Sequence, residues 1–549
     1  MREAERELKL SAPDALDEGT LLSAVRDAGF EPGDGAKRRQ RDRYLDTPGL
    51  DLARRGVALR RRDADGTARL CAKGPGGPGP GGVWSRLEHE AEVPPSAPLP
   101  ARAAELPEAL RHRIEPFSWG RSLQEVARLE TERTLHAVHA PLAGVKAELA
   151  LDRVRLEGAG GFTEIEIELG PGPSEPFEAL AEALRARLGL VPSPADKLAR
   201  ALALLGRPRP APPQPAALDP TLSFRLAAGR IFRRHLESLC RAEPAARLGE
   251  DSEGVHDVRV ATRRLRAAFR TFAAAFPERR LASSLHCIRA TGHVLGAVRD
   301  LDVLLIGLFE LAPELPASLA SDLVPLAELL HGVRDHERAR MLRFLGSPRR
   351  LRAMDRFELL VAGLEARDAA LTAARNSVAE RPTPGRDRPR APAGHGPGAR
   401  PLGEVAPEIL RAAAARVWRR GERIDKDSPR DDLHALRIAV KRLRYTAESF
   451  ADLYGKPLRG LLRRATALQD LLGAYNDAGV AAARLTAWLE TPAGRRLPRR
   501  TWAATGALLA LHEARGRKAR AGFKAAWREF SRGKARRELE AVLGADVGE

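Results

Sequence analysis

The sequence predicts an α+β unit built on an antiparallel β-barrel, followed by an all-α unit made of a duplicated helical bundle. Three observations predict this order. Charged residues recur at every second position in the first part of the chain, apolar residues recur at three- and four-residue spacing from about residue 221, and a basic helical motif occurs twice in that second part. Period two is typical of strands, whereas the longer spacing is typical of helices.

The 549-residue chain is too long for one ordinary domain. We expect a first domain over residues 1–203, a Pro-rich linker over residues 204–218 and a helical domain over residues 219–545. The helical domain is expected to contain two repeats and, between them, a disordered insert rich in Pro, Gly and Arg. The two repeats span residues 219–380 and 403–545, and the insert spans residues 381–402.

The first expected strand carries the pattern E-x-E-x-K. Successive side chains of a strand point to opposite faces, so Glu5, Glu7 and Lys9 share one face and Leu8 lies on the other. Burying charge is costly unless the charge is paired or metal-bound. Two carboxylates beside an ammonium group therefore suit a divalent metal next to a phosphate. A solvated edge strand is the alternative interpretation.

The same alternation recurs in later segments, and a helix would scatter these residues around its axis. Several charged faces, some basic and some acidic, indicate strands that close around a charged interior while the outer face packs against helices. The alternating sets are Arg60 and Arg62; Arg69, Cys71 and Lys73; Arg86, Glu88, Glu90 and Glu92; Glu148, Ala150 and Asp152; and Glu164, Glu166 and Glu168.

Helices are also expected within the first domain. Residues 101–130 read as mainly helical, with Ser122 and Glu125 spaced as in a capping box. Residues 176–189 and 195–205 are further helical candidates.

The charge of the chain is unevenly distributed. Residues 1–200 carry 30 Lys and Arg against 33 Asp and Glu, which leaves 62 against 40 for the rest of a chain whose net charge is +19. The excess of basic residues in the second part indicates a polyanionic partner. An aromatic content of only 5% disfavours base stacking on single-stranded nucleic acid.

Other compositional features exclude several classes. The sequence contains no run of eighteen apolar residues, so it predicts no transmembrane helix. Its first residues are charged and do not resemble a secretory signal. Cys71, Cys240 and Cys287 are far apart and odd in number, so they form neither a disulfide framework nor a zinc site. We therefore expect a cytoplasmic location and no membrane partner.

The second part contains an internal repeat. VHDVRVATRRLRAAFRTF begins at Val255 and LHALRIAVKRLRYTAESF begins at Leu433, an offset of 178 residues. LGAVRDLDV from Leu295 and LGAYNDAGV from Leu472 form a second pair with an offset of 177. Two paired blocks with nearly one offset indicate a tandem duplication of a helical unit.

On helices, the repeated blocks place basic residues along one stripe, where like charges repel unless an anion neutralises them. We therefore predict anion binding by the stripe as a whole. Its members are His256, Arg259, Arg263, Arg264 and Arg266 in the first copy, and His434, Arg437, Lys441, Arg442 and Arg444 in the second. The alternative to anion binding is a solvated face whose basic residues pair with acidic residues of neighbouring helices. The two histidines are equally suited to structural hydrogen bonds. We interpret Asp300 and Asp477 as structural partners of the stripe.

The first part resembles the CYTH family, also called triphosphate tunnel metalloenzymes, over roughly residues 1–203. The resemblance rests on E-x-E-x-K and on the segments RYLDTPGLDL from Arg43, GVALRRR from Gly56, SRLEHEAEV from Ser85, ELALDRVRL from Glu148 and TEIEIELG from Thr163. The segment ADKLARAL is similar to the closing Ser-Lys-x-x-Arg motif of the family, with Asp196 where Ser is usual.

The second part resembles the CHAD family, the conserved-histidine α-helical domain, over roughly residues 219–545. This resemblance rests on the duplicated His and Arg blocks. CYTH followed by CHAD is similar to the bacterial inorganic triphosphatases. The resemblance implies an enzyme that hydrolyses inorganic triphosphate, binds polyphosphate through the helical domain, and associates with polyphosphate granules.

Together these interpretations predict a metal-dependent triphosphatase with Mg²⁺ or Mn²⁺ as cofactor, since both ions favour oxygen ligands. The expected catalytic residues are Lys9, Arg60, Arg62 and Lys73, and the expected substrate-binding residues are Arg86, Arg133, Lys197 and Arg200. The expected metal ligands are Glu5, Glu7, Asp152, Glu164, Glu166 and Glu168. The sequence does not distinguish which of Glu164, Glu166 and Glu168 bind metal, or how many metal ions are bound. The repeated stripe is the expected polyphosphate site.

Other functions fit the same residues. A thiamine triphosphatase or nucleoside triphosphatase would use the same tunnel and differ only beyond the terminal phosphate. A non-catalytic polyphosphate-binding protein is the non-enzymatic alternative. Nucleic-acid binding is disfavoured, because no groove-reading motif accompanies the basic charge.

Overall fold

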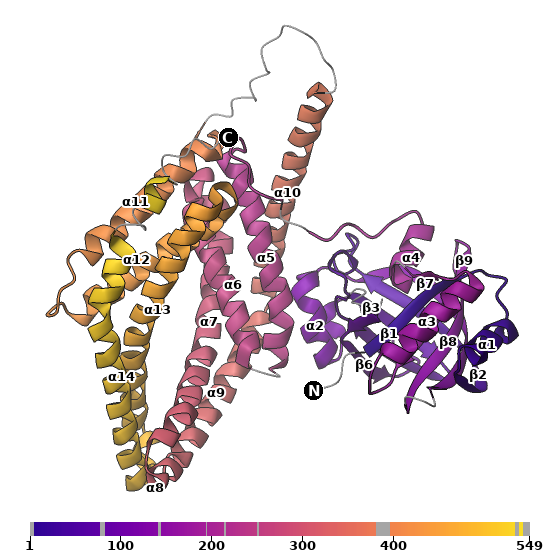
Figure 1. Ribbon diagram of the computed structural model, residues 1–549, viewed down its shortest axis with the longest axis horizontal. Helices are drawn as coiled ribbons and strands as arrows, with labels where there is room; N and C mark the ends of the chain where they lie inside the picture. The colour runs from indigo at the N-terminus through magenta and orange to yellow at the C-terminus, as the bar shows by residue number, and fades with distance from the viewer. Residues whose placement is uncertain are drawn as a thin grey trace. The chain divides into compact units, whose positions relative to one another are not determined.

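The computed structural model describes residues 5–76, 83–140, 144–193, 195–213, 216–249, 252–379, 396–532 and 537–541 (Figure 1). The chain divides into two compact units, Met1–Gln214 and Pro215–Glu549. Most of the expected disordered insert lies outside the described residues. Its described end holds a 3₁₀ turn at Pro397–Ala399 and the first residue of a helix that begins at Leu402.

The first unit is built on a ten-stranded antiparallel sheet. The strands follow one another in the order β10-β1-β9-β8-β7-β2-β3-β4-β6, and β5 pairs with β1. Their bounds are β1 Glu5–Ala12, β2 Glu31–Asp46, β3 Ala58–Ala64, β4 Thr67–Lys73, β5 Val83–Arg86, β6 Glu88–Val93, β7 Gln124–Ala140, β8 Val145–Leu156, β9 Gly161–Leu169 and β10 Val191–Pro192.

The sheet curls around a charged interior. Strands β5 and β6 are separated by Leu87 alone, yet β5 pairs with β1 and β6 pairs with β4. The segment Val83–Val93 therefore bridges strands from opposite ends of the sheet. The predicted fold class is confirmed: a curled antiparallel sheet is followed by a helical unit.

Two helices cover the outer face of the sheet, as the alternation in its strands requires. Ile165 and Ile167 of β9 are fully buried in a core that they share with α1 (Glu18–Asp27) and α3 (Glu175–Leu188). Because side chains alternate along a strand, the glutamates between them face the interior. A second core lies against α4 (Lys197–Leu204). The helices predicted at residues 176–189 and 195–205 are confirmed.

The helix predicted over residues 101–130 is wrong beyond residue 118. Helix α2 spans Glu108–Ser118 and ends where Trp119 takes a left-handed conformation, φ 49°. Strand β7 then begins at Gln124, so Ser122 and Glu125 do not form a capping box. Pairing of β7 with both β2 and β8 along nearly its whole length overrides the local helical pattern.

The second unit is helical throughout its described length. Its α-helices are α5 Phe224–Leu248, α6 Ser252–Thr271, α7 Glu278–Leu311, α8 Ala317–Ser321, α9 Val324–Leu345, α10 Pro348–Ala379, α11 Leu402–Gly421, α12 Arg430–Ser449, α13 Ala451–Glu490 and α14 Arg499–Ser531. Among the described residues, no helix has the length and apolarity that a membrane span requires.

The repeat is visible in the order of the helices. The duplicated basic block falls on α6 and α12, and the second repeated block falls on α7 and α13. Helices α6 and α12 pack against each other, so the two copies of the basic stripe lie on neighbouring helices. The rings of Phe272 and Phe450, 5.9 Å apart between centroids, join the two repeats beneath them.

Candidate active site and basic helical surface

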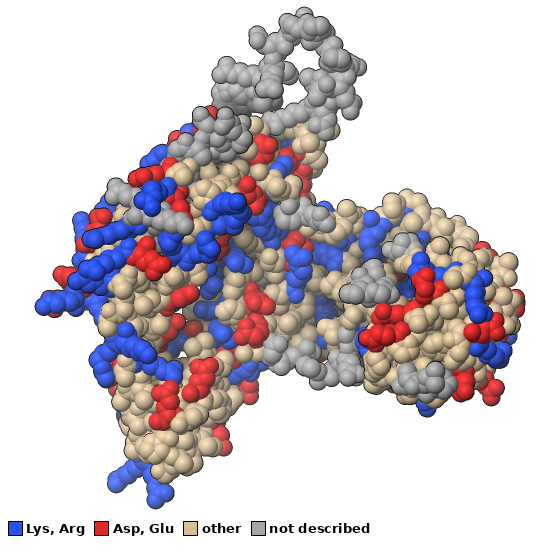
Figure 2. Space-filling view, in the orientation of Figure 1, with Lys and Arg blue, Asp and Glu red and all other residues tan. Residues whose placement is uncertain are grey.

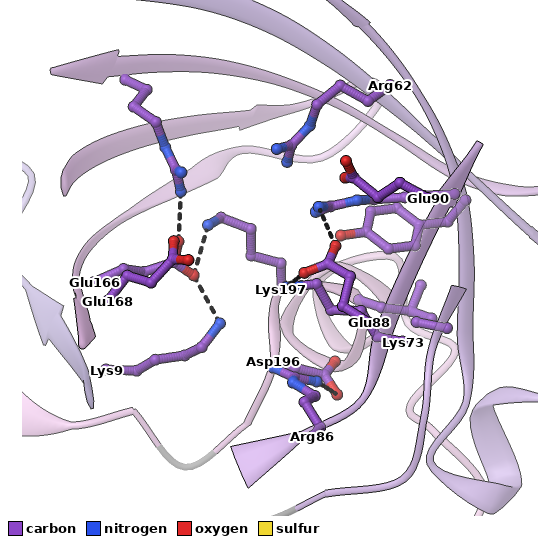
Figure 3. A pocket seen from close by; sticks show the side chains of 15 residues that line it. Lys9, Arg62, Lys73, Arg86, Glu88, Glu90, Glu166, Glu168, Asp196 and Lys197 are labelled. Carbon is purple, nitrogen blue, oxygen red and sulfur yellow. Dashed lines mark hydrogen bonds and ion pairs between the residues drawn. The ribbon is translucent and has the colours of Figure 1, made fainter. Parts of the chain in front are cut away.

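A cavity of about 350 Å³ lies inside the curled sheet, and charged side chains line almost all of it (Figure 3). Seven of the eight cations predicted for the tunnel line this cavity, and the eighth, Arg200, does not. The lining residues are Lys9, Tyr44, Ala58, Arg60, Arg62, Lys73, Arg86, Glu88, Glu90, Arg133, Glu166, Glu168, Asp196, Lys197 and Leu198.

Three carboxylates meet beside the cavity, and one of them, Glu166, lines it. Asp152 of β8 lies opposite Glu164 of β9 in the sheet register, and Glu166 is the next residue on the same face. Asp152, Glu164 and Glu166 each offer an oxygen within 4.8 Å of the others, and we call them the acidic triad. Hard oxygen donors at this spacing fit Mg²⁺ or Mn²⁺.

Cations hold the acidic triad together. The Nζ of Lys197 lies 2.7 Å from Asp152, 2.8 Å from Glu164 and 2.9 Å from Glu166. Lys9 binds Glu166 at 2.6 Å. Arg133 donates to both oxygens of Asp152, at 2.7 and 2.6 Å, and also binds Glu166. Each triad carboxylate therefore has at least one cationic partner before any ligand binds.

The cations also keep two members of the triad, Asp152 and Glu166, ionised. Burial by itself raises the pKa of Glu166, but Lys197, Lys9 and Arg133 lower that pKa well below its ordinary value. The pKa of Asp152 is lowered for the same reason, chiefly by Lys197 and Arg133 against the effect of burial. At neutral pH, Asp152 and Glu166 are thus carboxylates, which is the form that a metal ion requires.

The facing wall holds the predicted arginines of β3. Arg62 donates two hydrogen bonds to the carboxylate of Asp42, both 2.8 Å long, and Arg60 lies 3.6 Å from the same carboxylate. Arg60 and Lys73 also contact Glu88, at 3.3 and 2.9 Å. Asp42 is fully buried, and although burial opposes it, Arg60 and Arg62 lower its pKa to about 2.

The remaining expected metal ligands lie apart from the triad. Glu168 lines the cavity, and burial and the nearby Glu148 raise its pKa. Glu7 is buried and binds Arg86 at 2.9 Å and Lys9 at 3.2 Å. The side chain of Glu5 lies outside the described residues.

Arg200 lies behind the triad rather than in the cavity wall. Its guanidinium donates to Glu164 at 2.9 Å and stacks over the ring of Phe162, 3.8 Å from the centroid. This geometry suits orientation of a carboxylate more than direct contact with a ligand in the cavity.

Sequence reasoning missed several residues of the site. Asp42 and Tyr44 alternate on β2, and this period-two signal was available in the sequence. Cys71, Glu88 and Glu90 form a second group with ligand atoms within 4.8 Å of one another. There the Cys71 thiol donates to Glu88 at 2.6 Å, and burial raises the pKa of the thiol to about 12.

In the helical unit, the two copies of the basic stripe form one crowded cationic surface. Burial, with Arg437 and Arg263 nearby, lowers the pKa of Lys441 to about 8. Burial and neighbouring arginines also lower the pKa of Arg259 and of Arg270. Mutual repulsion of this kind favours binding of an anion. Figure 2 shows Lys and Arg gathered over the part of this unit around α12 and α13.

Acidic residues neutralise only part of this surface. Asp300 lies 4.0 Å from Arg259 and 2.5 Å from Arg484, and Asp477 lies 3.3 Å from Arg437. The interpretation of the two aspartates as structural partners is thus confirmed.

Two further partners of the stripe are Asn476 of α13 and Glu448 of α12 itself. His434 has its Nδ1 2.7 Å from the side-chain oxygen of Asn476, which fits the structural alternative for this histidine. Glu448 contacts both Arg264 and Arg444, at 3.5 and 3.3 Å. His256, Arg266 and Arg442 also lie on these two helices.

Comparisons with known proteins agree with the two-part organisation. Residues 1–202 match the CYTH domain family and residues 230–486 match the CHAD domain family. The uncharacterized proteins Rv2226 and MT2285 of two Mycobacterium tuberculosis strains are each 29% identical to the chain over 470 residues, which is 80% of this chain and 80% of each relative.

Two solved structures are similar to separate parts of the chain. The CHAD domain from the plant Ricinus communis is 27% identical and covers 57% of this chain and 94% of its own, with a TM-score of 0.44. HpAC1 from Hippeastrum, described as an adenylyl cyclase candidate with a dominant triphosphatase activity, is 22% identical and covers 36% of this chain and 95% of its own, with a TM-score of 0.26.

Proposed function

We propose, for a chain that carries a CYTH domain followed by a CHAD domain, that the first unit hydrolyses inorganic triphosphate to diphosphate and phosphate, and that the second binds inorganic polyphosphate. The observation that carries the first proposal is the cavity, which seven cations line together with Glu166, a member of the acidic triad. A triphosphate and a divalent cation have opposite charges, and each finds its complement on a different part of this cavity.

The composition of the cavity supports an inorganic substrate. Of its lining residues, only Tyr44, Ala58 and Leu198 are uncharged. Binding pockets for organic ring systems are usually lined mainly by apolar and aromatic side chains. The described cavity offers little apolar or aromatic surface to a thiazole or an adenine ring, whereas its charged lining suits a phosphate chain.

The acidic triad is the proposed metal site. Asp152, Glu164 and Glu166 would hold Mg²⁺ or Mn²⁺, with Glu7 and Glu168 close enough in the sheet register to add a carboxylate for a second ion. When bound, the metal supplies positive charge to the phosphates and lowers the pKa of a coordinated water.

The cations of the tunnel have two roles in this proposal. In the free protein, Lys9, Arg133 and Lys197 neutralise the triad. If the triad held a metal ion, these side chains would be able to bind phosphate oxygens, Arg in pairs of hydrogen bonds and Lys as a point charge. Phosphoryl transfer depends mainly on positioning and charge stabilisation, so a covalent nucleophile is not needed.

A substrate panel tests the proposal. We expect Mg²⁺- or Mn²⁺-dependent turnover, with kcat/KM for tripolyphosphate at least about tenfold above the values for thiamine triphosphate and ATP, which corresponds to about 1.4 kcal/mol of transition-state binding. A preference for either organic substrate would favour the alternative triphosphatases. Absence of metal-dependent turnover on all three would leave a non-catalytic phosphate-binding protein.

The basic surface of α6 and α12 supports the proposed polyphosphate site. Cations crowd together there, and a flexible polyanion can follow two neighbouring helices. Competition between labelled polyphosphate and DNA at one salt concentration tests the partner, because salt changes both affinities. Tighter binding of DNA would contradict the proposal.

Polyphosphate affinity is expected to fall between pH 7 and pH 9. Lys441 has a pKa of about 8, because it is half-buried and faces Arg437 and Arg444 on its own helix and Arg263 on α6, while Asp477 of α13 opposes them. It is charged below this pH and loses its charge as the pH rises through it, so the protonated form binds a polyanion better.

Substitution of this lysine isolates its contribution. Lys441→Gln should bind more weakly at pH 7 and lose most of the pH dependence. Lys37→Gln is the matched control, because the Lys37 side chain is 78% exposed on the first unit. Fluorescence anisotropy at constant ionic strength measures the polyphosphate affinity of both variants as a function of pH. An unchanged pH profile in Lys441→Gln would contradict the assignment.

A further inference from the structure

Arg38 of β2 lies on the inner face of the sheet but outside the cavity lining. In the sheet register it stands directly opposite Arg133 of β7, which in turn stands opposite Asp152 of β8. Directly paired residues of an antiparallel sheet project from the same face, and Arg133 lines the cavity. Because neighbouring strands are about 4.8 Å apart, the backbone of Arg38 lies about 10 Å across the sheet from that of Asp152. Arg38 therefore extends a row of charges that includes a member of the acidic triad.

This part of the inner face is open to solvent. Glu148 of β8 and Glu168 of β9, which pair with each other farther from α4, are both exposed. The other end of the face is covered, because Leu129 and Phe162 belong to the core that packs against α4. Arg38 is itself exposed, so it lies toward the open mouth of the tunnel and away from the end that α4 closes.

The basic residues beside Arg38 on β2 differ from it in having acidic partners on the outer face. The ion pairs are Arg39–Glu132 at 3.3 Å, Arg41–Glu130 at 2.9 Å and Lys37–Glu18 at 3.6 Å. Among the residues that the structure describes, none forms an ion pair or a side-chain hydrogen bond with Arg38. The outer charges thus neutralise one another, whereas Arg38 presents a cation at the mouth of the tunnel.

Two buried side chains beside Arg38 also have unused hydrogen-bonding capacity. Gln40 and Thr131 stand opposite each other on β2 and β7, and they are only 8% and 2% exposed. Within the described part of the chain, neither the Nε2 of Gln40 nor the Oγ1 of Thr131 has a hydrogen-bond partner. Buried polar atoms are nearly always paired. The partner that these atoms lack is the kind of group that a ligand oxygen, or a water bridging to one, provides.

We infer that the tunnel accepts linear chains of four or more phosphates, and that Arg38 binds a phosphate beyond the third. A chain whose reacting end lies beside the acidic triad fills the cavity with its first phosphates. Its next phosphate leaves the cavity past Arg133 and meets Arg38, the neighbour of Arg133 in the sheet register. The inference rests on the proposed function, since it takes a phosphate chain as the substrate, and it extends the substrate class from triphosphate to longer chains.

Arg38→Gln in the full chain tests the inference through its dependence on chain length. At constant ionic strength, we expect KM for tetrapolyphosphate to rise by about fivefold, near the upper value for one exposed ion pair. KM for tripolyphosphate should change by less than about twofold, because the shorter chain does not reach this residue. Arg38→Lys keeps the charge and should recover part of the loss. Steady-state phosphate release from the two chains measures both KM values.

Arg39→Gln is the matched control, because it removes the same charge from the next residue of the strand. Its side chain is 88% exposed on the outer face, so both KM values should stay within about twofold of those of the unmodified protein. Three results would overturn the inference: no change in Arg38→Gln, an equal change for both chain lengths, or an equal change in Arg39→Gln. Turnover of tripolyphosphate without turnover of tetrapolyphosphate by the unmodified protein would also overturn it.

Failure of the proposed function is a separate result, namely no turnover of either chain by the unmodified protein. Neither chain is then consumed, so isothermal titration calorimetry with Mg²⁺ and tetrapolyphosphate compares Arg38→Gln with Arg39→Gln directly. The helical unit is identical in the two variants, and its binding contribution cancels in the comparison. A loss of affinity confined to Arg38→Gln would support the contact, and equal affinities in the two variants would overturn it.

Discussion

Glu166→Gln is expected to lower turnover of tripolyphosphate by about 10² to 10³-fold, the usual cost of removing one preorganised charged group from an active site. Glu166 belongs to the acidic triad, lines the cavity and binds Lys9, Arg133 and Lys197. The amide is neutral, so a metal would lose a ligand. We also expect the Mg²⁺ concentration for half-maximal activity to rise, which steady-state kinetics over a metal titration measures.

The same strand offers a matched control. Glu168 lies two residues away on the same face and lines the same cavity, but it is outside the triad. Glu168→Gln should reduce turnover by only about tenfold, the lower end of the range for groups outside the main ligand set of a metal. Glu132→Gln, whose side chain is 51% exposed, should have no effect. A larger loss from Glu168→Gln than from Glu166→Gln would show that the metal binds elsewhere on the strand.

Lys197→Met is expected to destabilise the first unit by about 3–5 kcal/mol, because it removes the partner of buried charges. Its ammonium contacts all three triad carboxylates, and its side chain is only 5% exposed. For a domain of this size, the loss corresponds to a fall of roughly 10 °C in the unfolding transition, which differential scanning calorimetry of the full chain can follow.

Metal and pH should both change the size of this loss. Mg²⁺ should raise the transition of Lys197→Met more than that of the unmodified protein, because the ion replaces the missing positive charge. Without Lys197, the effect of burial on Asp152 and Glu166 is less opposed, so their pKa is higher in the folded variant than in the folded unmodified protein. The destabilisation should therefore shrink as the pH falls below about 5. A variant as stable as Lys37→Met, altered at an exposed site, would contradict the assignment.

The sequence predicted the charged strand faces because strand alternation is a local property. It did not predict which carboxylates meet, because that depends on strand register and sheet closure. Glu164, Glu166 and Glu168 are equivalent by alternation, yet only the first two join Asp152. The sequence reading also assigned no strand to β2, and Asp42, which holds the two arginines of β3, was missed with it.

In the helical unit, the duplication could be read from the sequence but its packing could not. The repeated blocks establish two similar helices, whereas the contact of α6 with α12 depends on the core beneath them. That contact brings Arg263 of one copy against Lys441 and Tyr445 of the other. The lowered pKa of Lys441 is thus a property of the assembled pair of repeats.

The position of β1 in the sheet has a consequence for biosynthesis. This strand precedes the other strands of the sheet in the chain, and it pairs with β5, β9 and β10, which follow later. Lys9 and Glu166, which bind each other in the tunnel, are 157 residues apart. The nascent strand therefore has no partner until β5 (Val83–Arg86) has been translated, and its pairing is complete only after β9 and β10. Its alternating charges keep it from pairing with other exposed strand edges during that delay.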